Sequence, residues 1–419
     1  MKRELNAISL YTGIGGLDFG FEAAGFNTRV AVELDRHCAT LLQQMRSWPL
    51  ICDDICQVSS DDILKTAQLS RGEADVLIGG PPCQPFSKSS YWSTGDSPRL
   101  ADARAQTIRE YLRVLRDTLP RTFLIENVEG LGFRNKEEGL NLILATIAAI
   151  NSDCDVHYSA SYAVLNAVDY GVPQSRRRLF IIGSRDGRSF RFPLPTHASP
   201  DELVHHGIEP YRTAWDALWN VRAQAPGLEA RGKWADLLPS IPPGNNYLWH
   251  TERGGGLPLF GWRRRYWNFL LKLSPERPSW TLQAQPGPAT GPFHWDNRRL
   301  AAQELARLQT FPADIELTDK ASAQRMMGNA VPSLMAEVLA KEMKRQFLDD
   351  FENSPLQLRV DASPLPPPKY RAMAVPEKYR SLAGEHPAHP GTGKGARAHE
   401  RAAIGFWRGS LTLENVGRQ

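Results

Sequence analysis

The sequence predicts an α/β protein with a doubly wound, mainly parallel sheet and a smaller inserted domain. Segments typical of strands alternate with segments of helical length over the first half of the chain, a pattern that forms a parallel sheet with helices on both faces. After residue 195 the alternation stops, and eight of the eleven tryptophans fall between residues 215 and 295. That change in composition indicates a second domain within the first.

The expected elements follow in chain order. Strands are expected at residues 7–11, 28–33, 75–78, 122–125 and 179–183. Helices are expected at residues 17–24, 36–45, 104–116, 137–150, 301–308 and 332–347. Residues 1–195 and 296–347 would form the larger domain, and residues 196–295 the inserted one. Ligands of such sheets bind at the carboxyl ends of the strands, so a site is expected there.

The composition is that of an ordinary soluble protein. Of the 419 residues, 42% are hydrophobic and 23% charged, and the net charge is +4. No apolar run approaches the roughly 18 residues that span a bilayer, and the start is a poor secretory signal. The five cysteines are an odd number and do not make a disulfide framework. We therefore expect a reducing, cytoplasmic setting and no membrane partner.

A glycine turn follows the first strand and opens a helix, with the sequence Tyr11-Thr12-Gly13-Ile14-Gly15-Gly16. Glycines let the backbone approach a ligand, and the helix start offers free N–H groups. Alone, the turn is equally a cofactor loop or a plain tight turn. Glu33 at the second strand end could bind ribose hydroxyls, and Asp54 and Ile55 could meet an adenine. Together they favour an adenosine-containing cofactor, and no further nicotinamide feature supports a dehydrogenase.

Cys83 lies in the segment Gly79-Gly80-Pro81-Pro82-Cys83-Gln84-Pro85-Phe86-Ser87. Two prolines stiffen the backbone before it, at the ligand edge of the sheet. A thiol there could act as a nucleophile if its neighbours lowered its pKa, which is about 8.5 when unperturbed. The other four cysteines fit the usual interpretation of small buried hydrophobes. Cys52 and Cys56 lack a second ligand pair, so no metal is expected.

Glu126 directly follows the strand expected at residues 122–125 and would share a cleft with Cys83. A protonated carboxyl there could donate to a ring nitrogen of a substrate base. Farther along, the run Gln174-Ser175-Arg176-Arg177-Arg178 enters the last expected strand. Alternate strand residues share a face, so Gln174, Arg176 and Arg178 would point one way. Arginine donors suit phosphate and base oxygens.

In order and spacing, these motifs closely resemble the DNA cytosine-5 methyltransferase family of bacterial and phage type. The resemblance covers about residues 5–195 and 280–345, and it closes on residues 304–312 and Gly328-Asn329-Ala330-Val331-Pro332. It implies a Rossmann-like, S-adenosylmethionine-dependent catalytic domain, with residues 196–295 as a target-recognition domain. The family usually has Phe where Tyr11 stands and a second Pro where Ser333 stands, and residues 105–108 depart from its pattern.

The resemblance also assigns roles. S-adenosylmethionine would be the methyl donor, without a metal, and would be bound by Tyr11, Gly13, Gly15, Gly16, Glu33, Asp54, Ile55, Pro82 and Asn329. The target cytosine would be flipped out of the duplex, where its ring carbons become reachable. The Cys83 thiolate would attack carbon 6, and Glu126 would hold ring nitrogen 3. Arg178 would contact the base oxygen, and Arg176 would brace the site or a phosphate.

Residues expected to contact DNA are Gln84, Ser87, Gln174, Arg263, Arg264 and Arg265. The arginine triplet can meet phosphates, although a solvated charged face is the alternative. Any single tryptophan of the insert is best interpreted as core. The Pro-rich, basic tail at residues 348–419 is expected to be largely disordered. It could add DNA affinity, contact a partner, or do neither.

We therefore expect methylation of a specific duplex DNA sequence, in a restriction–modification or phage-defence setting, by a monomer on DNA. A cognate restriction or defence-system protein is the expected partner. One alternative is a transfer-RNA cytosine-5 methyltransferase, against which the long insert argues. The other is a catalytically silent DNA-binding regulator, against which the filled catalytic positions argue.

Overall fold

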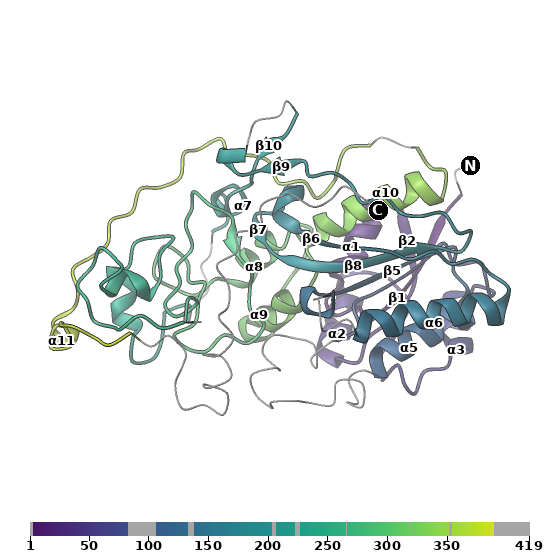
Figure 1. Ribbon diagram of the computed structural model, residues 1–419, viewed down its shortest axis with the longest axis horizontal. Helices are drawn as coiled ribbons and strands as arrows, with labels where there is room; N and C mark the ends of the chain where they lie inside the picture. The colour runs from purple at the N-terminus through teal and green to yellow at the C-terminus, as the bar shows by residue number, and fades with distance from the viewer. Residues whose placement is uncertain are drawn as a thin grey trace, which may run out of the picture. The chain divides into compact units, whose positions relative to one another are not determined.

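The computed structural model describes residues 3–82, 106–132, 138–202, 207–222, 227–264, 266–317, 319–351 and 354–388 (Figure 1). The chain divides into two compact units. Unit 1 comprises Met1–Leu228, Leu273–Pro286 and Leu300–Lys369, and unit 2 comprises Glu229–Lys272, Gly287–Arg299 and Tyr370–Gln419. Unit 2 thus includes only part of the insert expected at residues 196–295, and it also takes in chain from beyond residue 348.

Unit 1 is built on a seven-stranded sheet with the strand order β3-β2-β1-β4-β5-β8-β6. Its strands are β1 (Leu5–Leu10), β2 (Phe26–Val32), β3 (Leu50–Ile51), β4 (Val76–Gly79), β5 (Thr122–Val128), β6 (Ser161–Asn166) and β8 (Arg177–Ser184). Strands β1 to β5 pair in parallel, and β8 is antiparallel to both of its neighbours. The predicted mainly parallel, doubly wound sheet is confirmed.

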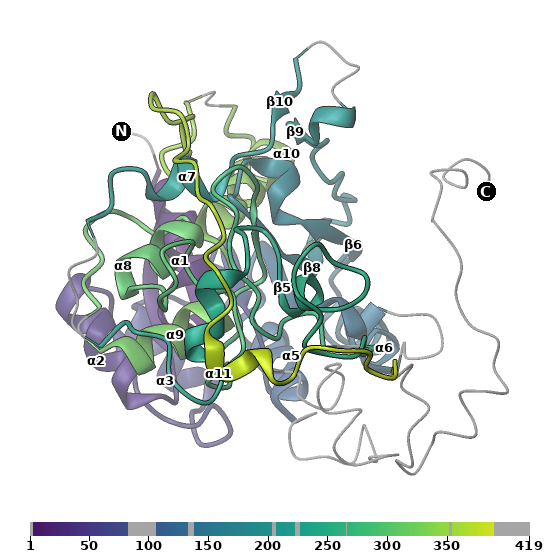
Figure 2. The ribbon, with the colours of Figure 1, turned by 90° about the vertical axis from the view of Figure 1, so that its left-hand side faces the viewer.

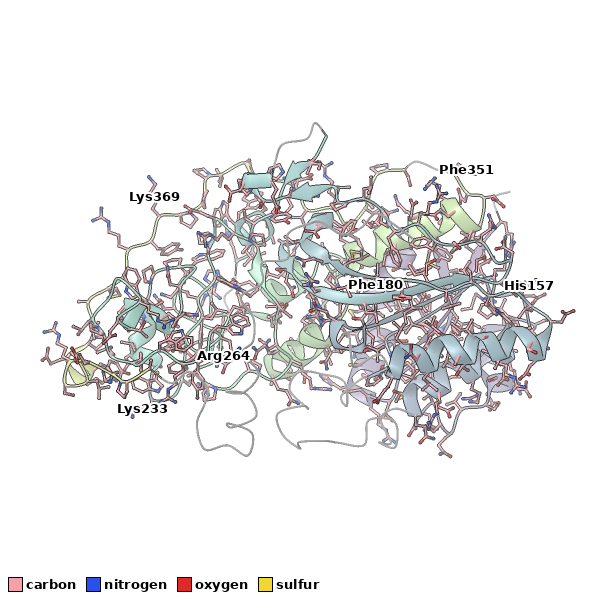
Figure 3. All side chains as sticks on the ribbon, viewed as in Figure 1. His157, Phe180, Lys233, Arg264, Phe351 and Lys369 are labelled. Carbon is pink, nitrogen blue, oxygen red and sulfur yellow. The ribbon has the colours of Figure 1, made fainter. Side chains whose placement is uncertain are left out.

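Helices cover both faces of this sheet (Figures 1 and 2). On one face, α1 (Gly16–Ala23) packs against α10 (Ser333–Phe347), and the other face carries α3 (Ser60–Ala67), α5 (Gln106–Thr118) and α6 (Glu138–Cys154). Each face buries its own apolar core. Phe180 of β8, labelled in Figure 3, is fully buried in the core that α1 and α10 cover.

The remaining elements are short or lie outside the sheet. They are α2 (Arg36–Met45), α7 (Ala214–Leu218), α8 (Ala302–Leu308), α9 (Lys320–Asn329), α11 (Glu377–Arg380), β7 (Gln174–Ser175), β9 (His197–Ala198), β10 (Glu209–Pro210) and β11 (Ser279–Trp280). The expected strands and helices are found, most of them with shifted ends and α2 with the ends expected. The elements that were not predicted are β3, β6, β7, β9, β10, β11, α3, α7, α9 and α11. None of the helices in the described ranges is long and apolar enough to cross a membrane.

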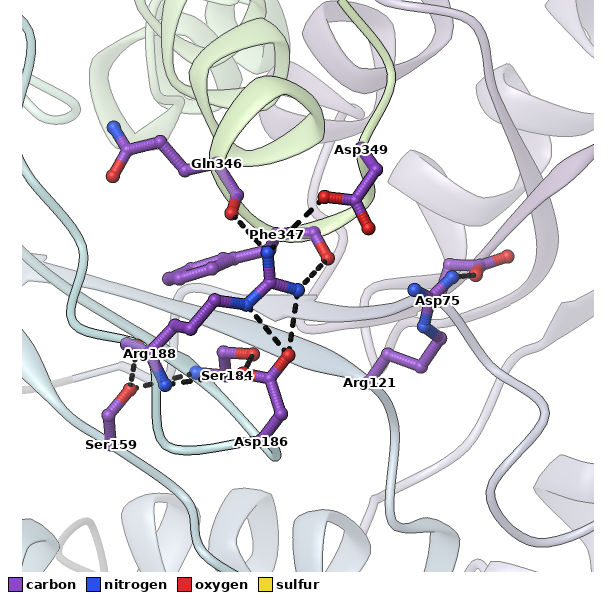
Figure 4. A network of polar contacts seen from close by, with 9 residues as sticks. All are labelled: Asp75, Arg121, Ser159, Ser184, Asp186, Arg188, Gln346, Phe347 and Asp349. Carbon is purple, nitrogen blue, oxygen red and sulfur yellow. Dashed lines mark hydrogen bonds and ion pairs between the residues drawn. The ribbon is translucent and has the colours of Figure 1, made fainter.

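Ion pairs fasten the edge of the sheet where the parallel strands begin (Figure 4). Arg188 donates to the carbonyl oxygens of Gln346 at 2.7 Å and Phe347 at 2.6 Å, and its Nε donates to Asp186 at 2.8 Å. Those carbonyls end α10 and have no partner within the helix. The buried carboxylate of Asp75 binds Arg121 at 3.2 Å. The ion pairs at this edge therefore have a structural role, and the functional site is expected at the opposite edge, at the carboxyl ends of the strands.

Unit 2 has little regular structure but a core of its own. Its buried members are Leu237, Leu238, Ile241, Tyr247, Leu259, Leu270, Phe293 and Tyr379. Tyr379 stacks on Trp234 with ring centroids 5.6 Å apart, and its hydroxyl donates to the carbonyl of Lys233 at 2.6 Å. Tyr379 belongs to the segment for which disorder was predicted. Within residues 354–388, Tyr379 is instead packed in the core of unit 2, and residues 389–419 lie outside the described ranges.

The same C-terminal segment is also packed on unit 1. Glu337 of α10 is fully buried, and its two carboxylate oxygens accept the backbone N–H groups of Gln357 at 2.7 Å and Leu358 at 2.9 Å. Lys341, one helical turn later, donates to the carbonyl oxygens of Ser354 and Pro355 at 2.7 and 2.8 Å. A buried carboxylate needs such partners, because leaving it without them is costly. The segment is therefore part of the folded unit.

We predict that Glu337→Gln lowers the free energy of unfolding by roughly 1–3 kcal/mol, because one of the two backbone N–H groups loses its acceptor on a buried side chain. Denaturant unfolding of the full chain measures this change. Glu342→Gln on the same helix is the matched control, since Glu342 forms an ion pair with an exposed arginine, Arg345. Such pairs contribute about 0–1 kcal/mol. Equal losses in the two variants would contradict the assignment.

Candidate active site

The glycine turn after β1 lies beside the end of β2. Gly13, with a φ of +58°, donates its N–H to one oxygen of the Glu33 carboxylate at 2.6 Å, and the other oxygen accepts the N–H of Asp35 at 2.7 Å. Burial raises the pKa of Glu33, and these N–H groups partly offset that rise. A Cβ added at Gly13 would meet nothing within 4 Å. The turn therefore borders open space beside a positioned carboxylate.

Two further segments reach this turn. The chain between α9 and α10 packs on the start of α1, where a Cβ at Gly16 would lie 2.4 Å from the carbonyl oxygen of Val331. Asn329, two residues earlier, is exposed. On the other side, Ile55 is buried, and Asp54 accepts the N–H of Cys56 at 3.0 Å. The open space, the carboxylate and the exposed amide fit an adenosine-containing cofactor.

The end of β4 meets the end of β5. The side-chain amide of Asn127 donates to the carbonyl of Pro81 at 3.0 Å, and a Cβ at Gly80 would lie 3.0 Å from a carboxylate oxygen of Glu126. The absence of a side chain at Gly80 thus lets Glu126 approach the backbone. Cys83, Gln84 and Ser87 lie outside the described residues. The described chain leads to Pro82, directly before Cys83.

Glu126 forms an ion pair with Arg178, whose Nε lies 2.9 Å from a Glu126 oxygen. The side chains are 11% and 18% exposed, so the pair lies at the border of the buried interior. Burial, the largest effect, raises the pKa of Glu126, and the charges of Arg178 and Arg176 partly offset it. A carboxyl with a raised pKa beside a cationic donor suits recognition of a heterocycle edge.

Arg176 and Gln174 share the inward side with Arg178, as the alternation predicted, but they are buried. Arg176 donates to the carbonyl of Gly328 at 2.8 Å, and its Nε has no hydrogen-bond partner among the described residues. Gln174 accepts the N–H of Leu282 at 3.2 Å and donates to the side chain of Gln309 at 3.1 Å. Gln174 was expected to contact DNA. Full burial gives it a positioning role instead.

Unit 2 carries arginines stacked on aromatic rings. The guanidinium of Arg253 lies 4.2 Å from the ring centroid of Trp262, and that of Arg263 lies 5.6 Å from that of Tyr266. Arg264, labelled in Figure 3, is exposed, and Arg265 lies outside the described residues. Stacking holds a guanidinium plane while leaving its edge free for hydrogen bonds. Arg253 was missed because it is isolated in the sequence.

No group of His, Cys, Asp or Glu that could hold a metal ion occurs within the part of the chain that the structure describes. The four cysteines at positions 38, 52, 56 and 154 are free thiols. Cys38 is buried, but Cys52 and Cys56 are exposed, so the expectation of small buried side chains is wrong for these two. Among the described residues, the functional groups at the strand ends are carboxylates, arginines, amides and backbone N–H groups.

Comparison with known proteins identifies relatives over most of the chain. A family model for C-5 cytosine-specific DNA methylases matches residues 5–345. Type II methyltransferase M.SacI of Streptomyces achromogenes is 38% identical over 375 residues, which are 83% of this chain and 94% of that protein. M.AquIA of Picosynechococcus, also a Type II methyltransferase, is 41% identical over 223 residues, which are 51% of this chain and 88% of that protein.

Solved structures share the fold at lower identity. The crystal structure of a Spodoptera frugiperda DNMT2 mutant has a TM-score of 0.57 at 15% identity, covering 81% of this chain and 99% of that one. The Schizosaccharomyces pombe Dnmt2 methyltransferase has a TM-score of 0.52 at 16% identity, with coverage of 83% and 99%. At this identity the likeness is one of fold.

Asp18, in the first turn of α1, is a buried acid that no sequence pattern singled out. It is fully buried, and neither of its carboxylate oxygens has a hydrogen-bond partner of good geometry among the described residues, although nearby Ser9 lowers its pKa somewhat. Burial is the main cause that raises its pKa from 3.8 to about 7, and the nearby acids Glu22 and Glu33 add to the effect. The folded protein therefore favours a proton on Asp18.

A raised folded-state pKa contributes stability that is fully present below the unfolded pKa and is lost as the pH rises through the folded one. We predict that Asp18→Asn removes this loss. The unfolding free energy of the wild type should fall relative to the variant between pH 3.8 and about 7, by roughly 1.4 kcal/mol per pKa unit. Denaturant unfolding across this range tests it. Asp61→Asn, in the exposed first turn of α3, is the control, and a pH-independent difference at Asp18 would refute the prediction.

Proposed function

Because the chain belongs to the C-5 cytosine-specific DNA methylase family, we propose that it methylates a flipped-out cytosine in a specific duplex DNA sequence through a covalent bond to Cys83. The chain is a methyltransferase, and its methyl donor is S-adenosylmethionine. The observation that carries the proposal is the buried Glu126–Arg178 pair beside the backbone that leads into Cys83.

The proposed cofactor residues come from four strand ends and the chain between α9 and α10. Tyr11 and the glycines at 13, 15 and 16 would face the cofactor backbone, Glu33 its ribose, and Asp54 with Ile55 its adenine. Pro82 and Asn329 would border the same space. When bound, S-adenosylmethionine supplies an electrophilic methyl group for carbon 5 of the base. The open space at Gly13 supports this placement.

Cys83 would act as the nucleophile toward the target cytosine. Its thiolate would bond to carbon 6 of the ring, which places negative charge on the path from carbon 5 to ring nitrogen 3. A protonated Glu126 would donate to nitrogen 3 and offset that charge. Arg178, already paired with Glu126, would donate to the base oxygen. Once carbon 5 carries the methyl group, a solvent base would take its proton. Cys83 would leave as the thiolate, the electrons of the broken C–H bond would restore the ring double bond, and the proton would return from nitrogen 3 to Glu126.

Arg176 would act behind these groups. Its contact with Gly328 joins the β8 strand start to the chain that carries Asn329, so it would hold the base site and the cofactor site together. Its charge lies close enough to lower the pKa of Glu126. The phosphate contact considered from the sequence is disfavoured by its burial, since the side chain is 1% exposed.

DNA recognition would fall to unit 2. Arg253, Arg263 and Arg264 are exposed on its loops, beside the half-exposed rings of Tyr266 and Trp267. Among described residues, these arginines have no carboxylate partner. Arginine edges pair with guanine in the major groove and with phosphates. By analogy with the Type II relatives, we place the enzyme in a restriction–modification system, acting in the cytoplasm as a monomer on DNA, with a cognate nuclease as the expected partner.

The direct experiment is transfer of labelled methyl groups to duplex DNA and, separately, to transfer RNA. We expect incorporation into DNA at carbon 5 of cytosine, and bisulfite sequencing of DNA from expressing cells should locate one short target. Incorporation only into transfer RNA would favour the alternative acceptor. Specific DNA binding without transfer to either would favour a silent regulator.

Two variants test the assigned roles in the same assay. Cys83→Ala is expected to lose methyl transfer, because no thiolate remains to activate the ring. Glu126→Gln is expected to slow transfer by roughly 10²–10⁴-fold, the usual effect of losing an acid or base, while cofactor binding is retained. A Cys83→Ala enzyme that still methylates DNA would refute the mechanism.

The arginine surface of unit 2 predicts a salt effect. The double variant Arg263→Ala/Arg264→Ala should bind duplex DNA more weakly, with a slope of log affinity against log salt that is smaller by about 1 for each phosphate that is no longer neutralised. Fluorescence anisotropy over a salt series measures both quantities. Arg380→Ala is the control within unit 2, because Arg380 is paired with Glu377 at 2.8 Å. An unchanged slope in the double variant would exclude these arginines from the interface.

A further inference from the structure

Two hydrogen bonds link the cofactor turn to the backbone before Cys83. The hydroxyl of Tyr11 donates to the carbonyl oxygen of Thr107 at 2.6 Å, and the Thr107 hydroxyl donates to the carbonyl oxygen of Pro82 at 3.1 Å. Tyr11 lies in the glycine turn, whereas Thr107 is the second residue of α5. The two bonds join three segments that are far apart in the sequence.

The Pro82 carbonyl belongs to the peptide bond that joins Pro82 to Cys83. A peptide unit is planar, so a bond that fixes this carbonyl also fixes the plane from which the Cys83 backbone starts. The preceding carbonyl, that of Pro81, is held from β5 by Asn127 at 3.0 Å. Successive carbonyls are thus held by different elements, and the proline rings restrict φ between them.

Tyr11 is suited to this task in the folded protein. Its φ of +55° is unusual for a residue with a side chain, and the turn conformation directs the ring toward α5. Burial, the largest effect, raises the pKa of its hydroxyl, so that the group remains a donor throughout the physiological pH range. The residue therefore does more than present a ring to the cofactor space.

We propose that Tyr11 and Thr107 are positioning residues that set the Pro82–Cys83 peptide relative to the cofactor turn. The proposal rests on the proposed function, because it requires Cys83 to be the nucleophile. Attack on carbon 6 and the approach of the methyl group to carbon 5 need one fixed geometry, and small displacements of reacting groups reduce rates strongly. The two hydrogen bonds would hold the Pro82–Cys83 peptide in that geometry relative to the cofactor turn.

The test uses Tyr11→Phe in the full chain, which keeps the ring and removes only the hydroxyl. The readout is the rate of covalent trapping on duplex DNA that contains 5-fluorocytosine, where the fluorine blocks release of the enzyme. Loss of one hydrogen bond, about 1 kcal/mol, corresponds to a trapping rate roughly 5-fold lower. The dissociation constants for S-adenosylmethionine and DNA should stay unchanged, because the positioning role affects attack and not binding.

Variants at Thr107 separate positioning from general stability. Thr107→Val should slow trapping as Tyr11→Phe does, and Thr107→Ser, which keeps the hydroxyl, should restore the rate. Because the two bonds act in series, the double variant Tyr11→Phe/Thr107→Val should be little slower than either single variant. Tyr158→Phe is the matched control, since that hydroxyl donates to the Pro120 carbonyl at 2.5 Å before the start of β5. It should lower the melting temperature without slowing trapping.

Trapping rates unchanged in both Tyr11→Phe and Thr107→Val, or reduced equally in Tyr158→Phe, would overturn the proposal. A change confined to the affinity for S-adenosylmethionine would also overturn it, because Tyr11 would then serve the cofactor alone. These outcomes differ from failure of the proposed function, in which the wild-type enzyme itself would form no adduct on 5-fluorocytosine DNA.

Discussion

The buried side chains of Gln174 and Arg176 are the contacts on which the geometry of the site depends. Gln174 binds Leu282 and Gln309, and Arg176 binds Gly328. Gln309 in turn donates to the carbonyl of Met327. These bonds bring segments from beyond residue 280 onto the sheet, where the start of α10 packs on the start of α1. The proposed cofactor turn and the proposed base site are therefore built on one framework of buried amide and guanidinium bonds. These bonds are costly to break because each leaves an unsatisfied polar group.

That framework explains why charged groups can lie within the site at low exposure. The Nε of Arg178 lies 2.9 Å from a carboxylate oxygen of Glu126. Each charge therefore has a partner of opposite sign. Burial raises the pKa of Glu126, whereas the neighbouring arginines limit the rise. Perturbed acids of this kind are common where a protein handles protons. The edge of the sheet where the parallel strands begin, with its Asp75 and Arg188 ion pairs, only fastens elements together.

Much of the fold could be predicted from the sequence, since apolar strands and glycine turns have strong local signals. The order of motifs also placed Glu33, Asp54, Glu126 and Arg178 at neighbouring strand ends. Long-range packing could not be predicted. The burial of Gln174 depends on partners more than 100 residues away, and the order of residues 354–388 depends on Glu337 and on the core of unit 2. From composition alone, such a Pro-rich segment is predicted to be disordered, because it contains few apolar residues.

The most direct test of the account is identification of the residue that bonds to the base. The enzyme would be trapped on duplex DNA containing 5-fluorocytosine at its target, digested with a protease, and examined by mass spectrometry. The account predicts one adduct, on the peptide that contains Cys83, and none from a Cys83→Ser variant. An adduct on Cys38, Cys52, Cys56 or Cys154, or methylation of DNA without any covalent intermediate, would contradict it.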